Sequence, residues 1–400
     1  MRIGIDARWI FRELSGIGIY TREMIRCLAD IDRENEYVLF FDRPEALEET
    51  CRLAQLSKAP NFSPLLLAYG PFSLRGQLVQ PTVFRKLRLD VFHSPNYMVP
   101  LRAFPKGRAG RTTCVVNVHD VIPLLFRNRL SRSKKARLFP LYRRIMLEVG
   151  RRADLIITGS TCSRTDVLRE LRIKDPGRVI VIPDGVDPRF APSSVEPRTG
   201  DITILYVGRL DPYKNVPRLV EAFSTVRKGS APGARLKIVG PKDERYPEAA
   251  LLAESLGVAP FVEWVGYVGD EDLVRAYQQA AVLVLPSHYE GFGLPALEAM
   301  ACGTPVICSN SSSLPEVVGD AALLVDPDNT DELVTAIARV LSDQTLRSDL
   351  REKGLRRAAR FSWRHTAALT LDAYRSSLSR GAGEGELRGA RSGHGAGDAA

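Results

Sequence analysis

Short runs of branched apolar residues recur along the chain, each followed by a turn and a longer stretch with helical spacing. Apolar runs bounded by turn residues are typical of buried strands, and their alternation with helices predicts parallel α/β sheets. The predicted strands cover residues 1–7, 37–41, 91–93, 115–118, 155–157, 179–183, 202–207, 236–239, 262–265, 282–285 and 323–325. The clearest helical patterns cover residues 20–30, 330–342 and 366–378.

The length of 400 residues is too great for one ordinary hydrophobic core and predicts two domains. The turn-rich sequence P-D-G-V-D-P follows the last predicted strand of the first half and marks the connection. The end of the chain is glycine-rich and polar, so we expect it to be disordered. The predicted units are a first domain at 1–183, a linker at 184–198, a second domain at 199–364, a last helix at 365–380 and a disordered tail at 381–400.

The most informative stretch is E-G-F-G-L-P-A-L-E, which follows an apolar run and enters a segment rich in helix formers. It predicts a strand, a glycine turn and a helix, whose first N–H groups, on Phe292, Gly293 and Leu294, can point at a phosphate. Glu290 and Glu298 flank the turn, and each carboxylate can accept two hydroxyl hydrogen bonds. A phosphate beside hydroxyl groups indicates a sugar nucleotide. The alternative is an ordinary turn with two solvated glutamates.

Other predicted strand ends carry candidate ligand groups. Gly16 and Gly18 form a glycine turn before the first helix, and His119 ends a buried strand with an acid beside it. Arg209 and Lys214 lie in the loop after the first strand of the second domain. Because parallel α/β sheets bind ligands at the carboxyl ends of their strands, these groups are candidates for one site. A lone histidine is more often structural, and both cations could be solvated loop charges.

Charge is distributed unevenly between the two halves. Residues 1–190 contain 33 Lys and Arg against 20 Asp and Glu, and the rest contains 23 against 27. The stretch from Arg127 to Arg152 has ten basic residues and one acid, interleaved with apolar positions. This pattern predicts a basic amphipathic helix that could lie on an anionic membrane surface or receive an acidic ligand. No RNA-binding signature or zinc finger accompanies it, so we expect no nucleic-acid partner.

The cysteines and acidic triplets predict no metal centre. The six cysteines contain no C-x-x-C pair, which argues against a zinc site and a disulfide framework. The three D-x-D triplets, at 30–32, 270–272 and 326–328, fall at predicted helix ends or turns and are explained as acidic caps. No apolar run is long enough to cross a bilayer, and the first residues enter a strand directly, so we expect a cytoplasmic protein.

The chain resembles retaining glycosyltransferases of the family-4, group 1 type over nearly its whole length. The motifs that carry the resemblance are S-G-I-G at 15–18, V-H-D at 118–120, G-R-L-D-P-Y-K-N at 208–215 and the E-x7-E stretch at 290–298. G-I-D-A-R and V-H-D-V-I-P look like the bacterial mannosyltransferases of surface polysaccharide synthesis. The resemblance implies the GT-B fold, an α/β architecture in which an acceptor-side and a donor-side Rossmann-like domain face each other across a cleft. It also implies that the last helix crosses back to the first domain.

The resemblance further implies roles for the candidate residues. Arg209 and Lys214 would hold the donor diphosphate, because fixed cations stabilise the charge of the departing nucleotide. Glu298 would accept the ribose hydroxyls and Glu290 the hydroxyls of the transferred sugar. His119 would face that sugar from the other domain. The remaining groups that would approach the phosphates, sugar or acceptor are the backbones of Gly16, Gly18, Phe292, Gly293 and Leu294.

The expected function is transfer of a hexosyl group, expected to be mannosyl, from GDP-mannose or another nucleotide sugar to a glycan or lipid-linked acceptor. We expect no cofactor, retention of anomeric configuration and no metal requirement, since Arg209 and Lys214 neutralise the leaving group. With Glu290 and Glu298 assigned to hydroxyls, no carboxylate remains for a double displacement, which favours attack on the leaving-group face. The alternatives are a silent sugar-nucleotide-binding protein of an assembly complex, or an epimerase or phosphorylase on the same fold.

Overall fold

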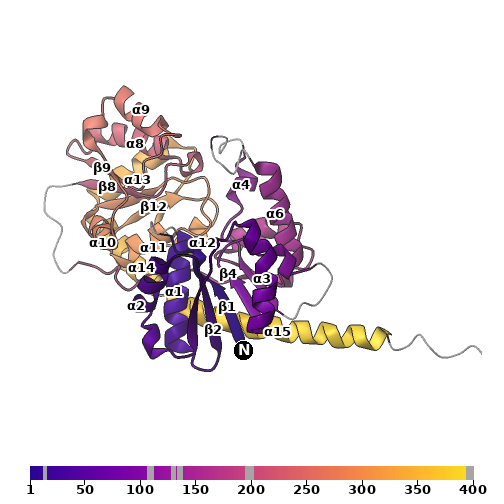
Figure 1. Ribbon diagram of the computed structural model, residues 1–400. Coiled ribbons are helices and arrows are strands. Elements are labelled where there is room, and N and C mark those ends of the chain that lie inside the picture. The colour runs from indigo at the N-terminus through magenta and orange to yellow at the C-terminus, as the bar shows by residue number, and fades with distance from the viewer. Residues whose placement is uncertain (12–15, 106–111, 128–131, 133–137, 194–201, 393–400) are drawn as a thin grey trace, which may run out of the picture.

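The computed structural model describes residues 1–11, 16–105, 112–127, 132, 138–193, 202–392, and it divides into two α/β domains (Figure 1). The first domain contains a seven-stranded sheet with the order β3-β2-β1-β4-β5-β6-β7. Its strands are β1 (Arg2–Asp6), β2 (Glu36–Phe41), β3 (Phe62–Leu66), β4 (Val91–Ser94), β5 (Thr113–Asn117), β6 (Leu155–Thr158) and β7 (Val179–Val181). Its α-helices are α1 (Gly16–Ile31), α2 (Pro44–Leu53), α3 (Leu74–Leu87), α4 (Ile122–Leu125), α6 (Phe139–Arg152) and α7 (Thr161–Glu170).

The second domain contains a six-stranded sheet with the order β10-β9-β8-β11-β12-β13. Its strands are β8 (Thr203–Val207), β9 (Arg235–Val239), β10 (Val262–Gly266), β11 (Val282–Leu285), β12 (Val306–Ser309) and β13 (Leu323–Val325). The helices after the linker are α8 (Val216–Lys228), α9 (Glu248–Ser255), α10 (Asp270–Gln279), α11 (Leu294–Ala301), α12 (Leu314–Val318), α13 (Thr330–Ser342), α14 (Gln344–Ala358) and α15 (Trp363–Ser392). Short 3-10 turns are η1 (Ala7–Trp9), η2 (Leu56–Lys58), η3 (Leu101–Ala103), η4 (Pro176–Arg178), η5 (Pro212–Lys214) and η6 (Ala259–Phe261).

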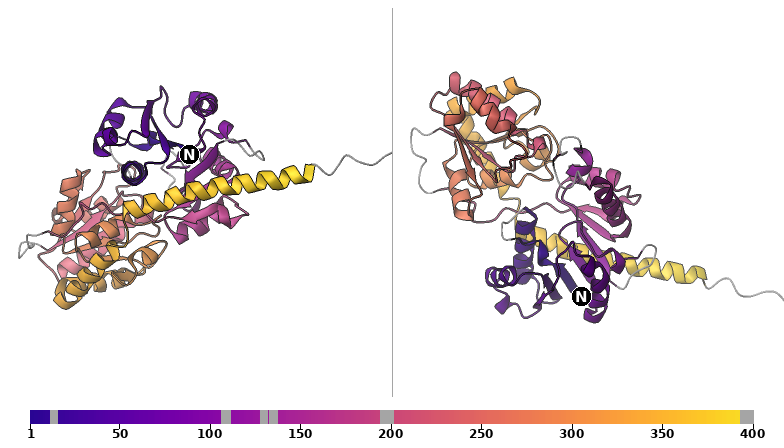
Figure 2. Two further views of the ribbon diagram at one scale, coloured as in Figure 1. Left: turned by 90° about the horizontal axis from the view of Figure 1, so that it is seen from below. Right: turned by 45° about the horizontal axis from the view of Figure 1, so that its top comes forward.

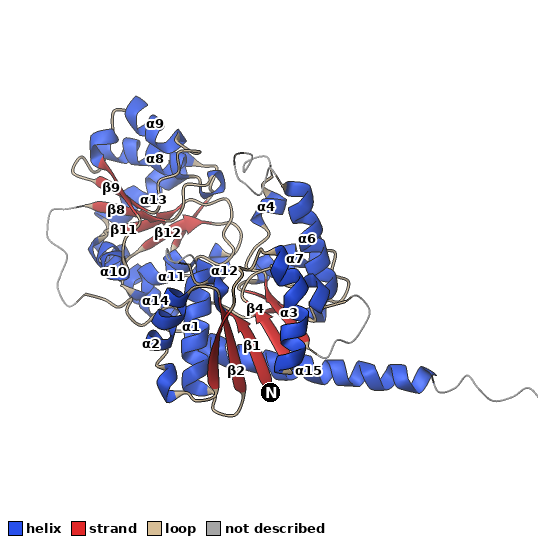
Figure 3. Ribbon diagram, viewed as in Figure 1, coloured by secondary structure: helices blue, strands red, loops and turns tan. Residues whose placement is uncertain are grey.

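Every pairing between the named strands is parallel, so the carboxyl ends of all strands in a sheet meet at one edge. Helices cover both faces of each sheet (Figure 3). Successive residues of β2 alternate between two apolar cores: Leu39 packs with α1 and α15, whereas Phe40 packs with α3, α6 and α7. The alternation explains why the strand reads as a nearly continuous apolar run.

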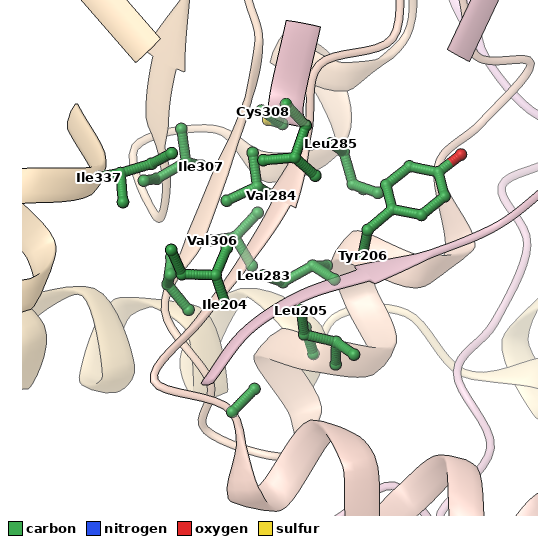
Figure 4. Close-up of a cluster of buried hydrophobic side chains, with 14 of the residues drawn as sticks. Ile204, Leu205, Tyr206, Leu283, Val284, Leu285, Val306, Ile307, Cys308 and Ile337 are labelled. Atoms are coloured by element: carbon green, nitrogen blue, oxygen red, sulfur yellow. The ribbon is translucent and has the colours of Figure 1, made fainter. Parts of the chain in front are cut away.

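The core of the second domain is built around its central strands. β8, β11 and β12 contribute a cluster of fully buried branched side chains (Figure 4). Tyr206 stands at one side of this cluster, with its hydroxyl directed away from the aliphatic groups (Figure 4). That hydroxyl donates a 2.6 Å hydrogen bond to the carbonyl of Arg209. The core therefore also fixes the loop that follows β8.

The sequence did not predict β3, β12 or the length of the last helix. β3 lies at the sheet edge, contains Pro64 and is largely exposed, so it lacks the apolar run of a buried strand. The helix α15 continues to Ser392, through residues 381–392 that were expected to be disordered. Since no proline interrupts it, extending an existing helix costs much less than starting one. The rest of the predicted tail, residues 393–400, lies outside the described residues.

Helix α15 begins in the second domain's last connection and packs against α1 of the first domain. Trp363 and Tyr374 are buried in that contact, and the Tyr374 hydroxyl lies 2.5 Å from Nδ1 of His93 on β4. Figure 2 shows the helix running under the first domain and projecting beyond it. Among the helices that the structure describes, none is long and apolar enough to span a membrane.

Helix α6 covers the second half of the basic stretch. Helix α6 starts at Phe139, and residues 128–131 and 133–137 lie outside the described part of the chain. Arg152 donates to the carbonyls of Leu101 and Phe104 at 2.9 and 2.8 Å and also pairs with Glu148, so this cation serves the fold. The prediction of an amphipathic helix is therefore confirmed over Phe139–Arg152, where Pro140 suits the first helical turn.

Candidate active site

The turn after β11 positions the candidate donor-binding groups. Gly293 has a φ of +109°, a left-handed conformation that glycine adopts readily, and α11 begins at the next residue. The first N–H groups of a helix have no partner within it, so those near Leu294 are available to a ligand. The hydroxyl of Ser313 donates to the carbonyls of Glu290 and Phe292 at 2.9 and 2.8 Å, which holds the turn in place.

Glu290 and Lys214 form a largely buried ion pair. The Lys214 Nζ lies 2.8 and 2.7 Å from the Oε1 and Oε2 atoms of Glu290. Ser287 donates a further hydrogen bond of 2.7 Å to Oε1. The side chains of Lys214 and Glu290 are only 16% and 10% exposed, so the two charges compensate each other. The tertiary structure thus brings together two residues that the sequence assigned to the diphosphate and to the sugar.

Arg209 reaches from the same loop into solvent. Its Nε lies 2.8 Å from Oδ2 of Asp211, and its side chain is 60% exposed. Asp211 precedes the 3-10 turn η5, but its side chain makes no capping hydrogen bond and pairs with Arg209 instead. The loops after β8 and β9 approach closely here, because a Cβ on Gly240 would lie 2.0 Å from the carbonyl oxygen of Gly208.

Glu298 occupies a different environment from Glu290. The hydroxyl of Tyr277 donates to its Oε2 at 2.7 Å, and the carboxylate is buried in the middle of α11. Burial raises the pKa of Glu298 to about 7, the hydrogen bond from Tyr277 opposes this, and Asp270 and Asp187 add to it. The carboxyl group therefore changes charge close to neutral pH.

His119 faces this turn from the first domain. It follows β5, its Nε2 lies 3.0 Å from the carbonyl oxygen of Pro95, and its ring meets the edge of Tyr20 with centroids 5.1 Å apart. A carbonyl oxygen only accepts, so Nε2 carries a proton in this contact. Burial raises the pKa of nearby Asp184 to about 6, and the charge of His119 opposes the rise.

The two domains meet at Gly291, between the Glu290 carboxylate and the amides of α11. A Cβ at Gly291 would lie 2.9 Å from the backbone oxygen of His119, so only glycine fits this approach. The hydroxyls of Ser160 and Ser163 donate to the Gly291 carbonyl at 2.8 and 3.0 Å. Sequence reasoning missed both serines, although the G-S-T-C-S turn after β6 lies on the same sheet edge as His119.

A second contact joins helix α7 to the donor-side domain. The backbone N–H groups of Thr161 and Cys162 each donate to the carboxylate of Glu316 on α12, both at 3.1 Å. The hydroxyl of Tyr289 donates to Asp166 at 2.7 Å. A carboxylate at a helix N-terminus is favoured by the helix dipole, so these contacts stabilise the docking of the two domains. We call the hydrogen bonds from Ser160 and Ser163 to Gly291, and from Thr161 and Cys162 to Glu316, the clasp.

The other residues predicted for the site are Gly16 and Gly18, near the start of the chain. Gly16 opens α1 and is exposed, Gly18 is buried in its first turn, and residues 12–15 before them lie outside the described residues. In the described ranges no group of three or more His, Cys, Asp or Glu side chains could hold a metal ion. Asp32, the last residue of the D-x-D triplet at 30–32, accepts hydrogen bonds from Asn35 and Tyr37.

Comparison with known proteins identifies the family. Residues 189–357 match the model of glycosyl transferases group 1, and residues 14–190 match that of glycosyltransferase family 4. The O-antigen chain mannosyltransferase B of Escherichia coli is 30% identical over 380 residues, which cover 90% of this chain and 96% of that protein. This chain belongs to the family-4, group 1 glycosyltransferases.

Further similarities support the family and the fold of this glycosyltransferase. The MMP alpha-(1->4)-mannosyltransferase of Mycolicibacterium hassiacum is 30% identical over 422 residues, covering 95% of this chain and 99% of that protein. The structure of sucrose-phosphate synthase from Thermosynechococcus elongatus superimposes with a TM-score of 0.72 at 22% identity, covering 95% and 99% of the two chains. The GT-B architecture expected from the sequence is confirmed.

Proposed function

We propose that this glycosyltransferase moves a mannosyl group from a nucleotide sugar to a glycan or lipid-linked acceptor in surface polysaccharide synthesis, with retention and without a metal ion. The observation that carries the proposal is the ion pair between Lys214 and Glu290 beside the first turn of α11. A cation, a carboxylate and helix N–H groups together provide partners for a diphosphate and a sugar. The choice of mannose rests on the similarity to the mannosyltransferases of Escherichia coli and Mycolicibacterium hassiacum.

Donor binding would exchange the partners of this ion pair. The diphosphate would take the Lys214 ammonium and the exposed Arg209 guanidinium, with the first N–H groups of α11 as further donors. Glu290 would then be free to accept hydrogen bonds from sugar hydroxyls, and Glu298 from the ribose. His119 would meet the sugar from the opposite domain, because Gly291 holds the donor turn against its backbone.

The transfer itself would proceed on one face of the sugar. The acceptor oxygen forms a bond to the anomeric carbon while the bond from that carbon to the phosphate oxygen breaks. The acceptor hydroxyl proton passes to the departing phosphate, so the nucleoside diphosphate leaves with the bonding electron pair. Its developing negative charge is stabilised by Lys214 and Arg209, as fixed cations stabilise charge that develops in a transition state.

The test is incubation of the full chain with labelled GDP-mannose, and with UDP- and dTDP-sugars as controls, in the presence of lipid-linked and soluble glycan acceptors. We expect transfer from GDP-mannose, a retained anomeric configuration by NMR, and equal rates with and without EDTA. An inverted product, loss of activity in EDTA, or binding without transfer would each contradict the proposal.

We also propose that the enzyme works at the cytoplasmic face of the membrane, with α6 against anionic headgroups. Arg143 and Arg144 on α6 are exposed, and together with Arg127 they line a cavity of about 560 Å³. A contact of this kind is electrostatic, so it weakens as salt screens the charges. Replacing Arg143 and Arg144 by alanine should reduce binding to anionic vesicles at low salt, and unchanged binding would contradict the proposal.

A further inference from the structure

Exposed apolar side chains gather on one part of the first domain. The described residues include eleven large apolar side chains that are exposed, and six of them lie beside β3 and α3. Monomeric proteins seldom expose apolar groups together unless the surface binds something. The six are Phe11, Leu66, Phe72, Leu74, Leu78 and Val79. We call Phe11, Phe72, Leu74 and Leu78 the apolar patch.

The rings of the patch are held in place from beneath. Trp9 is buried, and its ring meets the edges of Phe72 and Phe11 with centroids 5.4 and 6.1 Å apart. Leu74 and Leu78 are one helical turn apart on α3 and are 83% and 58% exposed. Gly76 between them faces inward, where a Cβ would lie 3.0 Å from the ring of Tyr69. Trp9 and the close packing of α3 on Tyr69 therefore hold the apolar side chains at the surface.

The charge around the patch is mainly positive, with Asp42 beside Arg43 as an acid at its border. Residues 51–89 contain six Lys and Arg and no Asp or Glu, which leaves the surface of this region basic. Arg75 on α3 is exposed, and the Arg43 guanidinium lies 5.4 Å from the centroid of the Phe11 ring. Apolar groups surrounded by cations suit the boundary between the headgroups and acyl chains of an anionic bilayer.

The polar groups near the patch do not suit a glycan. A sugar chain needs carboxylate, amide or hydroxyl partners, but residues 51–89 contain no acid, and Asp42 beside Arg43 is only 19% exposed. Gln77 on α3 is already engaged with the carbonyl of Val99 and the N–H of Leu101, at 3.0 and 2.8 Å. The side chains left at the patch are mainly apolar or cationic, which favours lipid.

The patch lies at the same sheet edge as the candidate active site. β3 ends beside it, and β5 ends before His119, with β2, β1 and β4 between them. At a spacing of about 4.8 Å per strand, the two strand ends are roughly 19 Å apart. A bilayer at the patch would therefore lie near the acceptor side of the reaction centre.

We propose that the apolar patch inserts into the membrane interface and holds the acceptor side of the cleft at the surface of an anionic bilayer. The benefit to catalysis rests on the proposed function, because it requires a lipid-linked acceptor. The binding itself does not, so the two ideas can fail separately. Apolar insertion also differs from the α6 contact in persisting when salt screens the charges.

The test compares the full chain with the double variant Leu74→Ser and Leu78→Ser in sedimentation with phosphatidylglycerol-containing vesicles at high salt. We expect the variant to bind about tenfold or more weakly, because each serine removes apolar area from the interface. Leu251→Ser is the matched control, since Leu251 is also 58% exposed but lies on α9 of the other domain. Equal binding by the patch variant and the native chain would overturn the proposal.

Turnover measurements distinguish a failure of the membrane-insertion proposal from a failure of the proposed function. On a soluble acceptor the patch variant should react at the native rate, whereas on an acceptor embedded in vesicles it should be slower. Loss of vesicle binding in a chain that transfers no sugar would support the patch and contradict the proposed function. A native chain that dimerises in light scattering, with the dimer lost in the patch variant and vesicle binding unchanged, would show that a second copy is the occupant.

Discussion

The Lys214 ammonium lies 2.8 and 2.7 Å from the two carboxylate oxygens of Glu290, although 76 residues separate them in the chain. Both groups are mostly buried, and each compensates a charge that would be costly alone. In the proposed mechanism a donor diphosphate takes Lys214 and releases Glu290 to the sugar. One ion pair therefore couples recognition of the leaving group to recognition of the transferred group.

Replacing Arg209 by alanine should lower kcat about 10²- to 10³-fold, as loss of one preorganised electrostatic group does in other enzymes. Arg209 is 60% exposed, so the fold should be unaffected. Lys214→Ala should lower kcat at least as much, and it should also lower the melting temperature because it leaves Glu290 unpaired. Steady-state kinetics and thermal unfolding measure the two effects. Lys237→Ala, which removes a half-buried lysine on β9, is the control. Near-native turnover in both test variants would refute the role of Arg209 and Lys214 in stabilising the leaving group.

The double variant Ser160→Ala and Ser163→Ala should separate donor binding from catalysis. The two hydroxyls hold the Gly291 carbonyl across the domain interface, but the proposed donor-binding groups Arg209, Lys214, Glu290 and Glu298 belong to the second domain. We therefore expect an unchanged donor Kd by calorimetry and a kcat about tenfold lower, which corresponds to about 1.4 kcal/mol. Thr165→Ala is the matched control, because that hydroxyl bonds within α7. If kcat stays native, the two serine hydroxyls of the clasp have no positioning role.

Donor affinity should increase as pH rises through about 7, where Glu298 becomes charged and accepts hydroxyl hydrogen bonds more strongly. Glu298→Gln should remove this dependence, and Tyr277→Phe should move it to higher pH, because the Tyr277 hydrogen bond lowers the Glu298 pKa. Calorimetric titration of the donor across this range measures the change. A flat profile in the native enzyme would exclude Glu298 as a donor ligand that titrates.

The same carboxyl group should make stability depend on pH. Its pKa is raised in the folded chain from an ordinary value of 4.5 to about 7, so the folded state holds the proton more tightly than the unfolded state. The stability it contributes is complete below pH 4.5 and is lost as pH rises through about 7. Compared with the native chain, Glu298→Gln should therefore gain melting temperature at pH 8 relative to pH 5. The opposite difference would show that the carboxylate is compensated in the fold.

Truncation at two points should distinguish the two parts of α15. Deleting residues 381–400 should leave the melting temperature and turnover unchanged, because the buried side chains that the structure describes on this helix, such as Trp363 and Tyr374, lie before that point. Deleting from Phe361 should unfold or disable the enzyme, because Trp363 and Tyr374 are buried against the first domain. A lower melting temperature in the shorter truncation would show that the added helix to Ser392 contributes to stability.

Local chemistry let the sequence predict the strand, glycine turn and helix around Glu290. The apolar run, the glycines and the helix formers determine the conformation of neighbouring residues, so the elements can be predicted without knowledge of the rest of the fold. The same holds for most of the strands and for α13, whose bounds agree with the prediction. Family motifs at residues 118–120, 208–215 and 290–298 then indicated the fold and the chemistry.

Tertiary structure decided which side chains meet. Lys214 pairs with Glu290, which is 76 residues away in the chain, and Ser160 donates to the carbonyl of Gly291, which is 131 residues away. The first N–H groups of α7 donate to Glu316, about 155 residues away. Contacts at such separations depend on how the two sheets are docked, and no local pattern encodes them. The raised pKa of Glu298 has the same origin, because burial created by packing of the whole domain, and not the sequence around the residue, sets its charge.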